Sequence, residues 1–547
     1  MKLLSLLLLF CFGISNQTFS QKNAPKVVVG IVVDQMCYDY LYRFYPQFGK
    51  DGFKRLMDKG THFRNVTYNY VPTYTGPGHA SIYTGTTPSD HGIVANEWHY
   101  RPFGREVNCV EDTTVSTVGS NSTFGKCSPA FLRSNTITDQ LKLTYPGSRV
   151  IGVSIKDRSA ILPAGHLSDG SYWYDYATGN FITSTFYRKE LPNWVSRFND
   201  QKLVSKYVNQ PWNLMKDSTC YTYLNQDNSP YEGLVGGKTS PVFPYDFSKS
   251  SPADQFNLFT IMPAANTFLT DFAIRALSEE QLGKHATTDF LTISYSTPDI
   301  AGHAFGPYSL EMEDMYFRLD QELARLLQTL DKEIGKGQYV VFLTADHAVV
   351  PVPQFLKDHQ LPGGYLFLKN KMDSLRIACT AKFGKDYLNT IENDNVYLTN
   401  DVLGTEMESQ VISFFKTEIT KWTEVKRVYT KEELLSKTNE NWQQMVASGY
   451  DKERSGELIF ILQPGYLPKT SDTPGAHKGT SHGSAFNYDT HVPVLFYGKD
   501  ILSQEVFTSY EIIDIAATLV HVLDVQRPNT TTGKPMLELF KRKSVLS

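Results

Sequence analysis

The segment VVVGIVVDQM, residues 27–36, decides the fold class of this chain. Its apolar residues are mostly β-branched and run without a polar interruption, which is typical of a strand buried on both faces of a parallel sheet. Similar runs occur at residues 149–154, 289–295 and 339–344. Segments with helical periodicity lie between them. This alternation predicts an α/β fold with a largely parallel central sheet flanked by helices.

The helical segments differ in length. The pattern predicts short helices at 52–59 and 78–84, a long one at 309–334 and another at 510–523. The long segment places five leucines on one side, as a helix packed on a sheet does. These are Leu319, Leu323, Leu326, Leu327 and Leu330.

The chain has 547 residues, more than one ordinary core needs, so we expect a large domain with insertions. Residues 21–547 form this predicted domain. Two stretches within it, 159–285 and 355–475, have shorter and more mixed elements than the rest. We interpret both stretches as insertions that form a cap over the sheet edge.

The N-terminus, MKLLSLLLLFCFGISNQTFSQ, has one Lys, an apolar run and then a polar stretch with small residues. This order predicts a signal peptide over residues 1–20, cleaved near Ser20. A membrane anchor is the alternative, but the run from Leu3 to Ile14 is shorter than the roughly 20 residues that span a bilayer. We therefore expect a periplasmic or secreted protein without a membrane anchor.

Composition excludes some partners. With 41% hydrophobic and 20% charged residues, the chain is typical of a folded globular protein. The net charge of −4 becomes −5 without residues 1–20, because Lys2 is the only charge there. A mildly acidic chain lacks the basic surface of a nucleic-acid binder.

Five cysteines remain after the predicted cleavage, so at least one thiol stays unpaired. Cys109 and Cys127 are near enough in sequence for a local bridge, but sequence does not establish the pairing. None of the five has zinc-finger spacing.

Several metal-binding side chains follow the apolar runs or lie in a small-residue segment, KGTSHGS. They are Asp34, Asp299, His303, Asp346, His347 and His482. A single Asp at a strand end is most often a turn or helix cap. In an open α/β sheet, however, the carboxyl ends of several strands meet at one edge, where ligands bind. Three Asp and three His there are the donor set for two divalent ions of zinc type.

A hydroxyl lies in the turn VPTYTGPGHAS, residues 71–81. Thr75 is the candidate nucleophile, with Thr73 as its competitor, and an ordinary helix N-cap is the alternative role. A hydroxyl at a helix start lies beside free amides that suit a phosphate, and a divalent metal makes it a stronger nucleophile. We expect His79 to hydrogen-bond within this helix. Two metals, a hydroxyl and no redox motif predict phosphoryl or sulfuryl transfer.

The chain resembles the alkaline phosphatase superfamily, and most of all its PafA-type, phosphate-irrepressible alkaline phosphatases. The resemblance covers nearly the whole mature chain. It rests on VVVGIVVDQM, VPTYTGPGHASIYTG, HGIVANEW, VIGVSIKDRSAILPAGH, STPDIAGHAFGP, FLTADH and GTSHGS.

The resemblance implies two Zn²⁺ per chain and an alkaline phosphatase-like fold. One ion would be held by Asp34, Asp346 and His347, with Thr75 also bound. The other would be held by Asp299, His303 and His482. Thr75 would form a phosphothreonine intermediate.

The resemblance also assigns Asn96, Lys156 and Arg158 to the substrate's phosphoryl group. Without it, Lys156 and Arg158 would be a solvated loop pair. Their spacing at the exit of a strand would direct both side chains the same way. Two cations favour a doubly charged phosphate monoester over a singly charged diester. The prediction is a monomeric phosphomonoesterase of alkaline phosphatase type that acts on small phosphate monoesters.

Other functions remain as alternatives. A phosphodiesterase or nucleotide pyrophosphatase of the same superfamily shares the metals and the threonine but not the cationic pair. A sulfatase would need a Cys or Ser in a C/S-x-P-x-R context, which Thr75 does not have. A secreted metal- or glycan-binding protein without activity is an alternative of another class. The chain departs from the superfamily at Ala348, where Gly is usual, and at Pro77, which suits a first helical turn.

Overall fold

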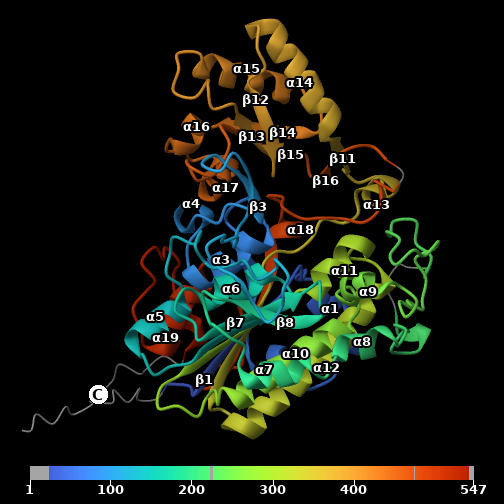
Figure 1. Cartoon of the computed structure of the whole chain (residues 1–547), viewed down its shortest axis with the longest axis vertical. Helices are drawn as coiled ribbons and strands as arrows, with labels where there is room; N and C mark the ends of the chain where they lie inside the picture. The colour runs from blue at the N-terminus through green and yellow to red at the C-terminus, as the bar shows by residue number, and fades with distance from the viewer. Residues whose placement is uncertain (1–23, 222–225, 474, 541–547) are drawn as a thin grey trace, which may run out of the picture.

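The fold is built around one large sheet, seen in the lower part of Figure 1. The structure is a computed structural model that describes residues 24–221, 226–473 and 475–540. The sheet has 10 strands in the order β18-β2-β17-β10-β1-β9-β6-β7-β8-β5.

The centre of this sheet is parallel, as predicted. β1 (Val27–Val33) lies between β10 (Tyr339–Thr344) and β9 (Asp289–Tyr295) and pairs in parallel with both. β6 (Val150–Ser154) extends the parallel set beyond β9, followed by β7 (Gly170–Asp175). All residues of these five strands are buried, which explains the nearly continuous apolar runs of β1 and β10.

The edges of the sheet are mixed. β17 (His491–Gly498) pairs antiparallel with β10 and with β2 (Thr61–Thr67). β18 (Gln504–Glu511) then adds in parallel to β2. At the opposite edge, β8 (Asn180–Ser184) and β5 (Thr117–Val118) are both antiparallel. The α/β class is confirmed, with parallel pairing at its centre.

Helices cover both faces of the sheet. On one face, Tyr83 of α3 (Thr75–Thr84) packs edge-on against Phe290 of β9. On the other, Thr270 of α10 (Ala264–Glu279) hydrogen-bonds to the Tyr295 hydroxyl at 2.9 Å. Residues 290 and 295 have opposite parity on one strand, so they point to opposite faces.

Other helices pack beside these two. With α3 lie α5 (Ile137–Thr144), α6 (Asp157–Ala164) and α19 (Asp514–Leu523). With α10 lies α12 (Leu310–Leu330), which also packs on α2 (Phe53–Lys59).

Two predicted helices differ from the observed ones. The helix predicted over 510–523 is wrong in its first part, because β18 continues to Glu511 and α19 begins at Asp514. Pairing with β2 and an edge contact between the Tyr510 and Phe63 rings favour the strand there. The helix predicted over 309–334 is α12, followed by a π-helical turn at Asp331–Gly335.

The two predicted cap segments behave differently. Part of 159–285 belongs to the central domain, because β7 and β8 are strands of its sheet and α10 covers one face. The physical reason is that Tyr172 and Tyr174 of β7 and Phe181 of β8 bury their aromatic rings in the main core.

Residues 355–475 contain a second sheet with its own core, at the top of Figure 1. Its strands are β12 (Leu388–Glu392), β13 (Asn395–Leu398), β15 (Leu458–Leu462) and β14 (Val425–Thr430), in that order. The helices α14 (Leu368–Phe383) and α15 (Glu408–Thr420) contribute to the same core. We call residues 355–475 the upper lobe.

Three further predictions concern the covalent and cellular state of the chain. The predicted signal peptide lies outside the described residues. Within the described residues, no helix combines the length and apolar character needed to cross a bilayer.

The bridge suggested for Cys109 and Cys127 is absent, because both are free thiols. Both belong to a small core under α3 and α6, where their burial raises the pKa of each thiol well above its usual value.

Gly30→Ala tests how closely α3 packs on β1. A Cβ at Gly30 would lie against the Tyr83 hydroxyl and 2.7 Å from Phe342 Cζ, both in the buried core. We expect overpacking to lower the unfolding midpoint by the equivalent of about 1–3 kcal/mol, measured by thermal unfolding of the mature chain. Gly147→Ala is the control, because its nearest neighbour would be Thr287 Oγ1 at 3.7 Å. Equal midpoints for the two variants would contradict this packing.

Candidate bimetal active site

The predicted metal ligands meet at the carboxyl ends of the three central strands. Asp34 directly follows β1, and the pair Asp346-His347 follows β10. Asp299 and His303 lie four residues apart on α11 (Thr297–Phe305), which begins just after β9. Parallel strands bring these residues to one edge because their carboxyl ends coincide.

The ligand atoms form two overlapping groups. Atoms of Asp34, Asp346 and His347 lie within 4.8 Å of one another, and so do atoms of Asp299, His347 and His482. His303 Nε2 lies 3.2 Å from Asp299 Oδ1, which places it beside the second group. The structure therefore brings all six predicted ligands together. The rings of His347 and His482 stack with centroids 3.5 Å apart, so His347 lies between the two groups.

Backbone carbonyls fix the orientation of the three imidazole rings. In each ring Nδ1 donates to a carbonyl oxygen, so Nε2 is left as the lone-pair atom that faces the carboxylates. The pairs are His303 with Thr480 O at 2.9 Å, His347 with Ala348 O at 2.9 Å, and His482 with Thr73 O at 2.8 Å. This arrangement is typical of metal-binding histidines.

The electrostatics of the site also fit cations. Burial, together with the Asp299 and Asp346 carboxylates, raises the pKa of Asp34 well above its usual value. Asp34 Oδ1 is buried and has no hydrogen-bond partner. Burial lowers the pKa of His347 and of His482, which favours the neutral, metal-binding imidazole. Divalent cations would neutralise the crowded carboxylates and satisfy these atoms.

Lys156 lies between the two groups. Its Nζ donates to Asp34 Oδ2 at 2.7 Å and to Asp299 Oδ2 at 2.5 Å. Burial alone would lower the pKa of this ammonium, but the Asp299 and Asp34 carboxylates outweigh burial and raise it. A permanent positive charge therefore lies at the centre of the site.

The nucleophile candidate is buried beside the ligands. Thr75 is the first residue of α3, and its Oγ1 lies 3.4 Å from His347 Nε2. Its competitor Thr73 instead donates its hydroxyl to Ser484 O at 3.1 Å. His79 Nδ1 donates to Thr75 O at 2.8 Å, which confirms the predicted bond within the helix. α3 comes this close to the strand end because Gly78 has no Cβ, which would otherwise clash with Asp346.

Asn96 and Arg158 lie next to this helix start. Asn96 Oδ1 accepts from Gly76 N at 2.7 Å, so the amide NH₂ of Asn96 remains as a donor. Arg158 Nη1 lies 3.9 Å from Glu97 Oε1 and 3.6 Å from Asp157 Oδ1.

The strand exit on which we based a common direction for Lys156 and Arg158 is absent, because neither residue lies in a strand. β6 ends at Ser154, and α6 begins at Asp157, so Lys156 is the residue before a helix and Arg158 lies in its first turn. Lys156 contacts the metal ligands, whereas Arg158 lies near Glu97.

Gln35 is a site residue that the sequence analysis missed. Its Nε2 donates to Asp299 Oδ1 at 2.6 Å, and its backbone N donates to Asp346 Oδ1 at 3.2 Å. Its φ of 65° is in the left-handed region, a conformation that costs a non-glycine residue about 1 kcal/mol or more. Its position directly after Asp34 was the only signal in the sequence. Gly302 leaves the space that the Gln35 side chain occupies.

Several known proteins are similar to this chain in sequence and in fold. Residues 28–485 match the family of type I phosphodiesterases and nucleotide pyrophosphatases. The chain is 42% identical to alkaline phosphatase PafA of Elizabethkingia meningoseptica over 95% of each protein. It is 40% identical to alkaline phosphatase PhoV of Synechococcus elongatus, over 98% of this chain and 99% of the relative.

A crystal structure of wild-type alkaline phosphatase PafA superposes with a TM-score of 0.89 and 40% identity, over 95% of this chain and 99% of that one. Sequence, fold and the two groups of buried ligands agree. The chain belongs to the type I phosphodiesterase and nucleotide pyrophosphatase family of the alkaline phosphatase superfamily.

Proposed function

We propose that this protein is a secreted, two-metal phosphomonoesterase that hydrolyses small phosphate monoesters through a phosphothreonine intermediate. One observation carries the proposal. A threonine hydroxyl at a helix start lies 3.4 Å from His347, the residue shared by two metal-binding groups. The chain that holds this arrangement is 42% identical to an alkaline phosphatase along nearly its whole length.

The donor set suits two Zn²⁺ ions. Asp34, Asp346 and His347 would hold one, and Asp299, His303 and His482 the other. When bound, the ions supply Lewis-acid stabilisation of the negative charge that develops on the reacting oxygens. Mixed Asp and His ligands also accept cobalt or manganese, so the choice of zinc is itself proposed.

The residues of the chain have distinct roles in this proposal. Thr75 Oγ1 attacks phosphorus in line with the leaving oxygen, and the P–O bond to the leaving alcohol breaks as the phosphothreonine bond forms. Water then cleaves the phosphothreonine and releases inorganic phosphate. The Asn96 NH₂ group, left free when its Oδ1 accepts from Gly76 N, is a donor to the equatorial oxygens.

Substrate class depends on Lys156 and Arg158. A monoester dianion gains more than a diester monoanion from two nearby cations, and Arg158 also offers a planar pair of donors to a phosphate. The matching family includes phosphodiesterases, so diester hydrolysis is the second candidate function. Export is proposed from the N-terminal segment of residues 1–20 alone.

Thr75→Ala tests the nucleophile. Loss of the only attacking hydroxyl should reduce the turnover of 4-nitrophenyl phosphate by at least ~10³-fold and abolish acid-stable ³²P labelling of the protein. Thr73→Ala is the matched control and should keep the labelling, because the Thr73 hydroxyl bonds to Ser484 O. Labelling of the Thr75→Ala chain would refute the assignment.

Arg158→Ala tests substrate class. We expect kcat/KM for an aryl phosphate monoester to fall roughly 10- to 100-fold, as expected for a charge-assisted hydrogen bond, and for its methyl diester to fall less than about threefold. Steady-state rates on both substrates measure the difference. If both rates fall equally, or if the wild-type enzyme prefers the diester, the monoesterase proposal fails.

Metal removal tests the bimetal assignment. Chelation should abolish activity, and added Zn²⁺ should restore it. His482→Ala should reduce the zinc content measured by atomic emission from about two ions per chain to about one, because the other group keeps its three ligands. His521→Ala, a substitution on α19 away from this site, should leave the content unchanged. Full zinc content without His482 would exclude it as a ligand.

A further inference from the structure

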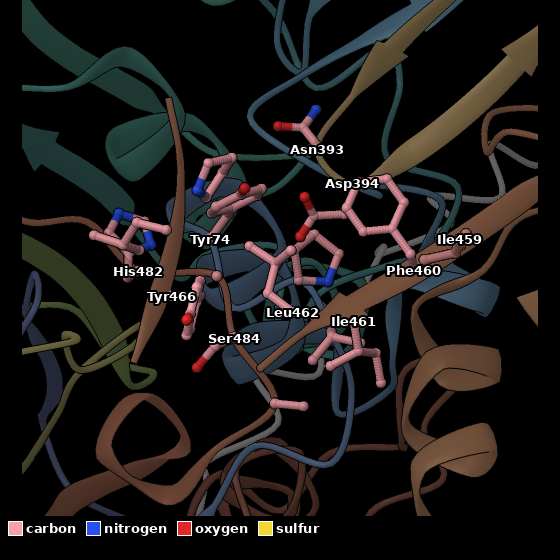
Figure 2. A pocket seen from close by; sticks show the side chains of 16 residues that line it. Tyr74, Asn393, Asp394, Ile459, Phe460, Ile461, Leu462, Tyr466, His482 and Ser484 are labelled. Carbon is pink, nitrogen blue, oxygen red and sulfur yellow. The ribbon is translucent and has the colours of Figure 1, made fainter. Parts of the chain in front are cut away.

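A pocket opens beside the nucleophile, between the sheet edge and the upper lobe. Its cavity volume is about 40 Å³, within about 530 Å³ of empty space that includes the opening to solvent. Tyr74 and His482 line it from the active-site side, and Phe460, Leu462 and Tyr466 line it from the upper lobe. Figure 2 shows Tyr74 and His482 on one side of this space and Asp394 on the other. Because Tyr74 directly precedes Thr75 and His482 is a proposed ligand of the second metal, the pocket adjoins the proposed leaving-group side.

The turn that carries Asp394 is held in place relative to the active site. Asn393 and Asp394 connect β12 to β13 and have φ values of 51° and 60°, as a two-residue hairpin turn requires. Asn393 Nδ2 donates to Glu97 O at 2.6 Å, and Glu97 directly follows the substrate-binding candidate Asn96. Phe460 N donates to Asp394 O at 3.0 Å. The lobe therefore presents this turn at a defined position.

The Asp394 carboxylate has no partner for one of its oxygens. Oδ1 is buried and makes no hydrogen bond. Burial raises the pKa of Asp394 to about 7, so the carboxyl is ionised in alkaline solution. No Lys or Arg is found among the described residues that line the pocket. An ionised, partly desolvated carboxylate without a cation is costly unless a ligand supplies one.

The remaining walls are mostly apolar. They are formed by Val71, Pro72, Tyr74, Ile459, Ile461 and Leu467. Such a surface binds an aromatic or aliphatic ligand by burying the ligand's apolar part. One charged group beside the surface then fixes the orientation of the ligand.

We propose that this pocket binds the leaving group of the substrate and that Asp394 selects monoesters whose leaving group carries a primary ammonium on an apolar body. The inference rests on the phosphomonoesterase function proposed above. Asp394 is a specificity residue in this account, because it contacts the leaving group and not the reacting phosphorus.

The test compares two substrates of similar shape, 4-(aminomethyl)phenyl phosphate and 4-ethylphenyl phosphate. We expect the wild-type enzyme to favour the amine in kcat/KM after correction for leaving-group pKa. Asp394→Asn should reduce that preference roughly 10-fold or more, while its rate on the ethyl compound stays within about twofold. Glu406→Gln is the matched control, since it removes the same charge from an exposed position of the upper lobe.

The outcomes separate this inference from the proposed function. If both substrates are hydrolysed without preference, or if Asp394→Asn lowers both rates equally, the specificity role of Asp394 is wrong and the phosphatase assignment stands. If neither is hydrolysed with zinc supplied, the proposed function fails. In that case, calorimetry with 4-(aminomethyl)phenol and 4-ethylphenol tests the pocket's preference for an ammonium without any reaction. Tighter binding of the amine that is lost in Asp394→Asn supports this preference. Equal binding of the two phenols refutes it.

Discussion

The structure depends on the crowding of three buried carboxylates at the carboxyl ends of three adjacent parallel strands. Asp34, Asp299 and Asp346 repel one another, and burial raises the pKa of Asp34. Such a cluster is stable only where cations compensate it. Lys156 supplies one positive charge within hydrogen-bonding distance of Asp34 and Asp299. The six-ligand donor set accommodates two more cations, and the rest of the site is arranged around this compensation.

The histidines are the second part of the arrangement, and their positions come from parts of the chain that are far apart. Each ring is held by a carbonyl oxygen, and two of these carbonyls, those of Thr73 and Thr480, lie far in sequence from the rings they orient. The turn before α3 therefore positions both the nucleophile candidate, through Thr75, and a metal ligand, through Thr73 O. A shift of the backbone in this turn would therefore move the Thr75 hydroxyl and the His482 ring together.

The upper lobe extends this dependence beyond the sheet. It has its own four-stranded sheet and apolar core, yet the turn at residues 393–394 hydrogen-bonds to Glu97 beside Asn96. Ion pairs of Arg101 with Glu457 and of Arg133 with Asp451 also join the lobe to the rest of the fold. In the proposals above, catalysis belongs to the sheet edge and leaving-group selectivity to the upper lobe, and the two parts meet at Tyr74 and His482.

The sequence by itself determined the parallel centre of the sheet and pointed to the candidate metal ligands. A strand buried on both faces can be predicted from its run of β-branched residues, because neither of its faces favours polar side chains. An Asp or His directly after such a run must then lie at the strand end. β1, β9 and β10 were predicted to within a residue for this reason. The features that depend on contacts between residues far apart in the sequence were decided only by the tertiary structure. β18 is a strand because β2 pairs with it, β7 and β8 join the main sheet instead of a cap, and Cys109 forms no disulfide. The left-handed backbone of Gln35 and the unpartnered Oδ1 of Asp394 are of the same kind, because both arise only when separate segments pack together.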